Sequence, residues 1–324
     1  MAGYIAWRLM QSAAALLAMS LLVFLAVYAI GNPITMLINP AAPAEVIDET
    51  IRRLGLDQPI YVQYSRFLEE ALRGNLGVSY ISSRPALQMI FERFPATLEL
   101  TLSAMLFAVL IGVPAGLVAG YWPESSFAKA TGTLSVIGIS LPSFWIGLML
   151  ITTFSIHYGW TPAGGRGELG SLFGVQSSLF TLDGLRHLIL PAINLSFFPL
   201  AMVVRLTRAG VQENAAAPHI RYARAKGLSS ARILLRYMLP SIAIPVVTVL
   251  GIVFGILLAY GVVTETVFAW PGIGKLIIEA IRTTDRPVII AYLLFTVLLF
   301  ALINLLVDLI CAFIDPRISL GRSP

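Results

Sequence analysis

Long stretches without a charged side chain constrain the fold of this chain more than any other feature. Six apolar segments are long enough to cross a membrane as helices, at 9–30, 100–123, 131–156, 187–204, 237–264 and 287–314, the last interrupted by Asp308. A helix needs about 20 apolar residues to cross a hydrocarbon core roughly 30 Å thick, and 187–204 only just meets this requirement. Because period-2 alternation is absent and a spanning segment must satisfy its own backbone hydrogen bonds, we expect helices.

The composition agrees with a chain that is largely solvated by lipid. Hydrophobic residues make up 57% of the 324 residues and charged residues 12%, about half of the charged fraction of a soluble protein. A water-facing surface cannot be built from so few charges. The first segment could be a secretory signal, but its apolar run of about 22 residues exceeds the core of a signal peptide, so we expect a retained helix. The sequence predicts an all-α integral membrane protein with six transmembrane helices.

The chemistry-bearing residues argue against an enzyme. The chain has one cysteine, Cys311, and three histidines that lie far apart in sequence, so we expect no metal site. No GxGxxG or GxxxxGK[ST] pattern indicates a nucleotide site, and no HExxH or GxSxG pattern indicates an intramembrane enzyme. A stand-alone secondary transporter is a second alternative, but it would normally show more helices, internal repeats and ionisable residues at the midplane.

The distribution of Lys and Arg predicts the orientation. With the N-terminus inside, the inner segments hold 11 of the 22 basic residues and the outer segments hold the other 11. Six of the outer ones lie in the long first loop, which is largely exempt from the positive-inside rule, so eleven inner residues compare with five outer ones. Both termini are therefore predicted to be cytoplasmic.

The long first outer loop has its own helical pattern. Segments 45–54 and 61–72 show helical apolar spacing, with a turn at 55–59 between them, and 84–94 is a third short amphipathic stretch before Pro95. We expect a small external cap. It could cover the helix ends or dock a soluble partner, and the sequence leaves both roles open.

The inner segment 205–240 carries 7 of the 22 basic residues and one acidic residue. Apolar or small residues recur on one helical face at Ile220, Ala223, Gly227, Ala231 and Leu234. Gly227 suits a helix end, and Ser229 suits the N-cap of a following helix. Adsorption on anionic lipid would explain the charge, whereas the small residues favour a surface that packs closely against a partner.

This segment resembles the cytoplasmic signature of permease subunits in binding-protein-dependent ABC importers, which is Glu-Ala-Ala, three residues, Gly, nine residues and Ile-x-Leu-Pro. The spacing from Gly227 to Pro240 matches, whereas Arg221, Tyr222 and Tyr237 replace the Glu, the first Ala and the Ile. An arginine at the first position resembles the branch of permeases for dipeptides, oligopeptides and nickel. The large first outer loop resembles the first and longer of the two permeases in that branch. Further stretches similar to that branch lie at 54–64, 73–79, 95–100, 141–145, 267–274, 285–287 and 315–317. One departure is Asn32, which stands where this branch usually has the aspartate of a Gly-Asp-Pro sequence.

The resemblance implies a type I ABC importer permease and a division of the chain. Residues 1–30 would hold the first helix, 31–96 an extracytoplasmic loop with short helices, 97–314 the permease core with a cytoplasmic coupling loop at 207–237, and 315–324 a cytoplasmic tail. The permease itself would hydrolyse nothing. Its partners would be a second homologous permease in a heterodimer, two ABC ATPase subunits that bind ATP and Mg, an extracytoplasmic solute-binding protein and membrane lipid, but no nucleic acid. It would lie in the bacterial inner membrane.

The same resemblance selects the site residues. The loop that docks on the ATPase would consist of Arg221, Tyr222, Ala223, Arg224, Ala225, Lys226, Gly227 and Leu228, with Pro240 behind it; its arginines can pair with carboxylates of the partner.

Candidates for the pathway are Ser140, Pro142, Ser143, Asn194 and Ser196, although ordinary kinks and interhelical hydrogen bonds are the favoured explanation of these residues. Asp308 and Glu265 are the two ionisable residues within the apolar segments, both near predicted helix ends. The substrate stays open among peptides, nickel chelates, glutathione, opines and sugars.

Overall fold

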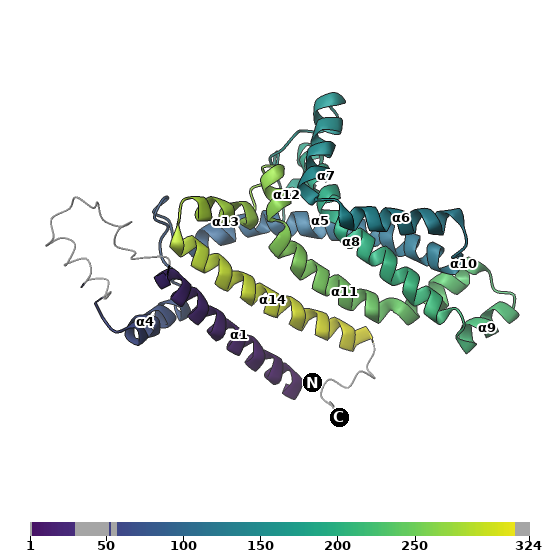
Figure 1. Cartoon of the computed structure of the whole chain (residues 1–324), viewed down its shortest axis with the longest axis horizontal. Coiled ribbons are helices and arrows are strands. Elements are labelled where there is room, and N and C mark those ends of the chain that lie inside the picture. Colours follow the sequence, from purple (N-terminus) through teal and green to yellow (C-terminus); the bar gives the residue numbers. More distant parts are fainter. Residues whose placement is uncertain (1, 30–51, 53–56, 315–324) are drawn as a thin grey trace. The chain divides into compact units, whose positions relative to one another are not determined.

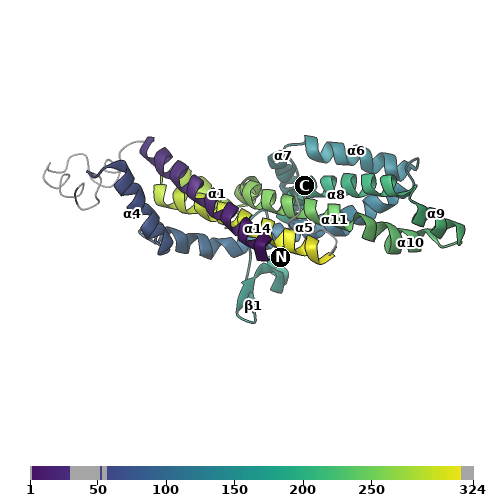
Figure 2. The same cartoon turned by 90° about the horizontal axis from the view of Figure 1, so that it is seen from below.

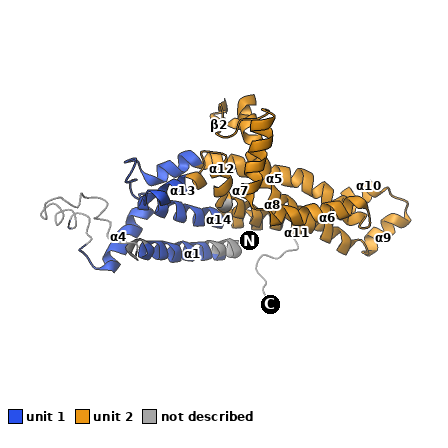
Figure 3. Ribbon diagram, turned by 45° about the horizontal axis from the view of Figure 1, so that its top comes forward, with its two compact units in different colours: residues 1–93, 276–301 blue, residues 94–275, 302–324 orange. Residues whose placement is uncertain are grey.

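A computed structural model describes residues 2–29, 52 and 57–314 of the chain (Figure 1). The helix expected at 45–54 and the tail 315–324 therefore fall almost wholly outside the described residues. The chain divides into two compact units (Figure 3): residues 1–93 with 276–301, and residues 94–275 with 302–324. The described residues of each unit are mostly helical.

The first unit contains α1 (Ala2–Ala29), α4 (Ile60–Leu72), the start of α5 (Ala86–Tyr121), the end of α13 (Ile273–Arg282) and the first part of α14 (Arg286–Ile314). The predicted amphipathic helix at 61–72 is confirmed as α4. Its inner face packs on α1, where the ring of Phe24 lies 5.4 Å from that of Tyr64 and 5.8 Å from that of Phe67. The hydroxyl groups of Ser20 and Tyr64 are 2.9 Å apart, which adds a hydrogen bond between the two helices.

The amphipathic stretch expected at 84–94 is not a separate helix. It is the beginning of α5, which runs without interruption through Pro95. A proline inside a helix removes one backbone hydrogen bond. The loss is tolerated here because the buried face continues on both sides of Pro95: Ile90 is 0% exposed and Ala96 and Leu100 are each 1% exposed.

The second unit contains the rest of the chain. Its elements are the remainder of α5, α6 (Ser126–Ser140), α7 (Ser143–Leu150), the π-helical η1 (Ile151–His157), β1 (Gly170–Leu172), β2 (Val175–Ser177), the 3-10 turn η2 (Ser178–Phe180), α8 (Leu182–Asn214), α9 (Pro218–Ala225), α10 (Ser230–Ile233), the π-helical η3 (Leu234–Met238), α11 (Leu239–Tyr260), α12 (Val262–Val267), the start of α13 and the end of α14. Helix α8 packs against both α6 and α11 (Figure 2). Strands β1 and β2 form an antiparallel hairpin with Ser171 opposite Gln176.

Three glycines on one face of α5 allow it to approach α8 closely. Gly112, Gly116 and Gly120 recur every four residues and face Val203, Thr207 and Val211 of α8. A Cβ atom at Gly116 would lie 2.6 Å from the Cβ of Thr207 and 2.8 Å from the carbonyl oxygen of Val204. Such stripes of small residues let membrane helices pack backbone to backbone.

Four described helices are long and apolar enough to cross a membrane: 86–121, 182–214, 230–259 and 286–310. The segment predicted as the third span is instead a bent pair, α6 and α7–η1, with an angle of 104° between its halves. Pro142 causes the break, because the residue before a proline is disfavoured in helical conformation and Leu141 is extended, with φ −80° and ψ 135°. If the pair is one span, the described helices provide five. In α1, the apolar stretch found is the shorter 10–26.

Candidate functional site

The basic segment between α8 and α11 folds into two short helices, divided near Gly227 and Ser229 as these two residues predicted. Helix α9 begins with Pro218 at its first position and ends at Ala225, and α10 begins after Ser229. Gly227 adopts a left-handed φ of +72°. The N–H groups of Gly227 and Leu228 then donate to the carbonyl oxygens of Arg224 and Ala223, at 2.9 and 3.3 Å. This pair of bonds is the Schellman helix end, in which glycine is strongly favoured because it has no Cβ atom.

An apolar core holds the loop from below. Ile220 and Ala223 of α9 are 0% and 1% exposed and belong to one buried cluster with Leu117 of α5, Val211 of α8 and Met238. Ala223, which was expected to touch a partner, is therefore unavailable for that contact in this conformation. Its small side chain lets α9 lie close to α5, so it shapes the loop from inside.

The outer surface of α9 is polar, basic and exposed. The exposed residues are Arg221, Tyr222, Arg224, Ala225, Lys226 and Gly227, while Leu228 is half-buried. The guanidinium of Arg224 lies 5.1 Å from the ring centroid of Tyr121, at the end of α5, and the ammonium of Lys226 lies 4.5 Å from that of Tyr222. Contacts of this kind are worth about 0.5–1 kcal/mol at exposed sites. Arg224, expected to pair with a partner's carboxylate, thus already has a contact within its own chain.

The wide turn η3 joins this loop to α11. Pro240 lies exposed where η3 passes into α11, inside the continuous helical stretch 230–259. A proline has no N–H to donate within a helix, and here it directly follows the widened turn η3.

Two of the five pathway candidates meet in one cavity. Ser143 and Asn194 line a space of about 460 Å³ together with Thr264 and mostly apolar side chains from α6, α7, α8 and α11. The Nδ2 atom of Asn194 donates to Oγ1 of Thr264 at 2.9 Å. Ser140 and Ser196 instead donate to backbone carbonyl oxygens of their own helices, Val136 at 2.9 Å and Ile193 at 2.8 Å. Pro142, the fifth candidate, makes the break between α6 and α7.

Glu265 joins α12 to α5 and α13 through buried hydrogen bonds, a role that the sequence did not predict. Its side chain is 0% exposed, although it was expected only near a helix end. Its carboxylate accepts from the hydroxyl of Thr97 at 2.6 Å and from the N–H of Lys275 at 2.9 Å. Thr97 in turn accepts from the N–H of Ile273 at 2.8 Å. Two orphan donors in the first turn of α13 are thereby satisfied, which fixes the start of this helix on α5.

The stretch 267–274, quoted for its resemblance, has a packing role around Glu265. A Cβ atom at Gly272 would lie 2.2 Å from Oε1 of Glu265, so only glycine fits. Trp270 is 0% exposed, and its Nε1 donates to the carbonyl oxygen of Ala96 at 2.8 Å.

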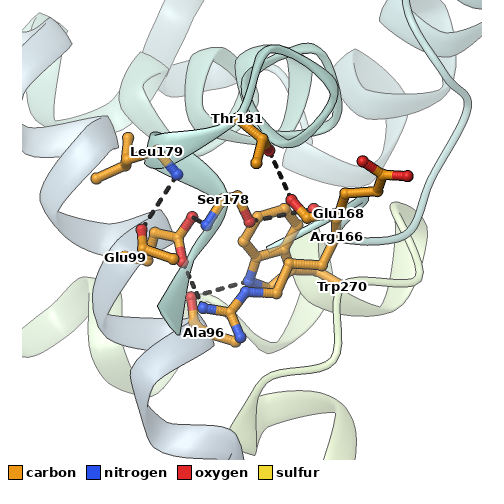
Figure 4. A network of polar contacts seen from close by, with 9 residues as sticks. Ala96, Glu99, Arg166, Glu168, Ser178, Leu179, Thr181 and Trp270 are labelled. Atoms are coloured by element: carbon orange, nitrogen blue, oxygen red, sulfur yellow. Dashed lines mark hydrogen bonds and ion pairs between the residues drawn. The ribbon is translucent and has the colours of Figure 1, made fainter. Parts of the chain in front are cut away.

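A second buried carboxylate anchors the loop that precedes α8 (Figure 4). Glu99 of α5 is paired with Arg166 at 2.5 Å and accepts from the N–H of Ser178 at 3.0 Å. Arg166 also lies 6.0 Å from the ring centroid of Trp270. The sequence offered no signal for this pair, because its members are 67 residues apart.

In the first unit, two of the stretches quoted for the resemblance contact each other. Asp285 accepts from the hydroxyl of Ser79 at 2.5 Å and from the N–H of Tyr80 at 3.1 Å. Burial raises the pKa of Tyr80, and the nearby positive charge of Arg286 partly opposes this rise.

Asp308 is half-buried in the part of α14 that belongs to the second unit. Among the described residues, no group of three or more His, Cys, Asp or Glu side chains could hold a metal.

Comparison with known proteins gives a consistent set of relatives. A family model described as "Binding-protein-dependent transport system inner membrane component" matches residues 112–320, and the model of its N-terminal region matches residues 1–101. The glutathione transport system permease protein GsiC of Escherichia coli (strain K12) is 38% identical over 319 residues, covering 98% of this chain and 99% of that protein.

A second relative and a solved structure agree with these matches. The di/tripeptide transport system permease protein DppB of Pseudomonas aeruginosa (strain UCBPP-PA14) is 40% identical over 306 residues, covering 90% of this chain and 91% of that protein. A chain of the inward-facing MetNI methionine ABC transporter is similar in fold, with a TM-score of 0.55 at 18% identity over 70% of this chain and 97% of its own.

Proposed function

This chain belongs to the family of binding-protein-dependent transport system inner membrane components. On that premise we propose which of its surfaces couples it to an ATPase and which solutes it transports. It is a permease subunit of an ABC importer in the bacterial inner membrane. The proposal adds that α9 is the surface that docks on the ATPase. The observation that carries it is an exposed basic helix, 218–225, seated on a buried core shared with α5, α8 and α11.

The physical reason lies in the stiffness of this loop. A loop that transmits force must move as a body with the helices behind it. Ile220 and Ala223 are fully buried against α5 and α8, and a cation–π contact joins Arg224 to Tyr121. A displacement of α9 is therefore passed to α5 and α8 as well as to α11. On the outside, Tyr222 is 63% exposed and offers a side chain to a partner.

The proposed topology has six spans with both termini in the cytoplasm. The four long helices, the bent pair and α1 supply these spans. The orientation is supported by the eleven basic residues of the inner segments, seven of which lie between 205 and 236. The α9 loop then faces the cytoplasm, where an ATPase subunit can reach it.

The proposed assembly pairs this chain with a second homologous permease, two ATPase subunits and an extracytoplasmic solute-binding protein. ATP and Mg would be bound by the ATPase subunits alone, since the sequence has no Walker-type GxxxxGK[ST] pattern. The proposed cargo is a small peptide or a peptide-like solute such as glutathione, as the names of the relatives suggest. Nickel chelates, opines and sugars are the alternatives within the same kind of importer.

Substitution of Gly227 tests the docking surface. Nothing lies within 4 Å of a Cβ atom built at Gly227, and its φ is +72°. Asparagine tolerates this backbone conformation, so Gly227→Asn should leave the chain folded and place extra bulk only against a partner. We expect the number of solute molecules imported per ATP hydrolysed to fall about fivefold or more, as for the loss of roughly 1 kcal/mol at a well-packed contact.

A matched control separates docking from backbone strain. Gly74 has a similar φ of +80° with nothing within 4 Å of its Cβ position, but it lies after α4 in the first unit. Gly74→Asn should keep the wild-type ratio of import to hydrolysis. If Gly227→Asn also keeps that ratio, α9 is not the docking surface.

The assembly is tested by purification from the native membrane. A tag on this chain should recover a second permease and ATPase subunits, and ATP hydrolysis in nanodiscs should rise when binding protein loaded with a peptide is added. A chain that purifies alone and transports solute without ATP would instead be a secondary transporter.

A further inference from the structure

The cavity beside the α6–α7 break has a polar corner in an otherwise apolar wall. Ser143, Asn194 and Thr264 supply the polar side chains, and Ile146, Phe198 and Ile256 are among the apolar ones. The lining residues include no charged side chain. A ligand held here would therefore be recognised by hydrogen bonding and apolar contact, and not by a full charge.

Asn194 is the one lining residue with an unused hydrogen-bonding group on a buried side chain. It is 2% exposed. Its Nδ2 atom is engaged by Thr264, but its Oδ1 atom has no hydrogen-bond partner in the structure. Buried polar atoms in proteins are nearly always paired, so an orphan acceptor beside a cavity requires an explanation. The accessible area of this oxygen is below 1 Å², so an N–H group in the cavity would satisfy it once the Asn194 side chain turns toward that space.

The proposed function supplies the source of that N–H group. A peptide carries one N–H donor at each bond, together with side chains that suit apolar and aromatic walls. Building on the proposed role as a pathway subunit, we propose that Asn194 is a substrate-contact residue, whose Oδ1 accepts a hydrogen bond from a peptide N–H while the solute passes through this cavity. Ser143, the first residue of α7 after the α6–α7 break, lies in the same wall.

The lining of the cavity suits weak, transient binding of a solute in transit better than tight binding. One hydrogen bond to a neutral group changes an affinity by about two- to tenfold. Such a contact discriminates between a peptide and an analogue that lacks the donor, but it does not trap the solute. Selectivity beyond that would come from the binding protein.

The first test compares trialanine with its analogue in which the second peptide nitrogen is methylated and cannot donate. The complete transporter is reconstituted in liposomes, and the binding protein is saturated with either probe. We expect the wild type to import trialanine about two- to tenfold more efficiently per ATP than the analogue. Asn194→Leu should remove this difference, mainly by lowering the import of trialanine. Thr133→Val is the control, since the hydroxyl of Thr133 donates to the carbonyl oxygen of Lys129 in its own helix at 3.1 Å.

A second measurement does not depend on either probe being carried. Cys311 is the single cysteine of the chain, so Cys311→Ala gives a background without thiols. In that background, Asn194→Cys should react with a small water-soluble thiol reagent during ATP turnover. Thr207→Cys, in the same helix but 0% exposed and packed against Gly116, should react far less. An unreactive Asn194→Cys, or an Asn194→Leu variant that still discriminates between the probes, would overturn the assignment. A wild type that hydrolyses no ATP with loaded binding protein would instead refute the proposed function.

Discussion

Replacing Gly116 by leucine is expected to remove most of the folded protein from the membrane. Even a single Cβ atom at this position would lie 2.6 Å from the Cβ of Thr207 and 2.8 Å from the backbone oxygen of Val204, and a backbone atom cannot move aside cheaply. Overpacking of a tight core costs about 1–3 kcal/mol, occasionally more, and a whole leucine side chain falls at the upper end. The melting temperature in detergent and the amount of chain in the membrane should both drop sharply.

A pair of alanine variants isolates the packing effect from helix propensity. Gly116→Ala should still lower the melting temperature, because its Cβ atom is the one that collides. Gly138→Ala in α6 should be neutral or stabilising, since the nearest atom to its Cβ would be 3.7 Å away, and alanine is favoured over glycine in a helix by about 1 kcal/mol. Equal melting temperatures for Gly116→Leu and the wild type would show that α5 and α8 do not pack through this stripe.

Glu265→Leu is expected to loosen the start of α13 and to destabilise the second unit. The change leaves the hydroxyl of Thr97 and the N–H of Lys275 without their acceptor in a fully buried place. Each buried donor left unsatisfied costs about 1–3 kcal/mol. Hydrogen–deuterium exchange of the amides in 273–277 should accelerate strongly, and the melting temperature should fall.

Glutamine is the matched variant for this position. Glu265→Gln keeps the size of the side chain and one acceptor oxygen for Lys275, and its amide nitrogen can donate to Thr97. We expect a much smaller change in exchange than for Glu265→Leu. If the two variants behave alike, the hydrogen bonds to Glu265 do not hold α13, and the residue acts only by filling space.

Local features were predictable from the sequence because they depend on neighbouring residues. The helix end at Gly227 follows from backbone preference, and the structure has it. Ser229 occupies the N-cap position of α10 as expected, but its side chain makes no capping hydrogen bond there. Helix α4 followed from its apolar spacing in the same way. Four of the six predicted spans followed from the length of the charge-free stretches; the first is found only as the shorter apolar stretch 10–26, and the third is bent at Pro142. That proline was interpreted as lying within a helix, although it could equally end one.

Contacts between distant parts of the chain could not be predicted in this way. Glu99 and Arg166, or Thr97 and Glu265, meet only because the helices fold back on one another, and no spacing in the sequence records this. The burial of Ala223 has the same origin, since the cluster that encloses it gathers side chains from α5, α8 and α11. Nothing in the spacing of the glycines at 112, 116 and 120 indicates which helix faces them; the structure shows that it is α8.

The central claim is that α9 contacts an ATPase subunit, and photocrosslinking from position 222 tests it most directly. Tyr222 is 63% exposed, so a photoreactive p-benzoyl-phenylalanine fits there without disturbing the core. Phe173, at the tip of the β1–β2 hairpin and 97% exposed, is the matched control position. In the complete transporter, light should join position 222 to an ATPase subunit and should not join position 173 to it. An ATPase product from 173, or none from 222 in a complex that contains the ATPase, would contradict the account.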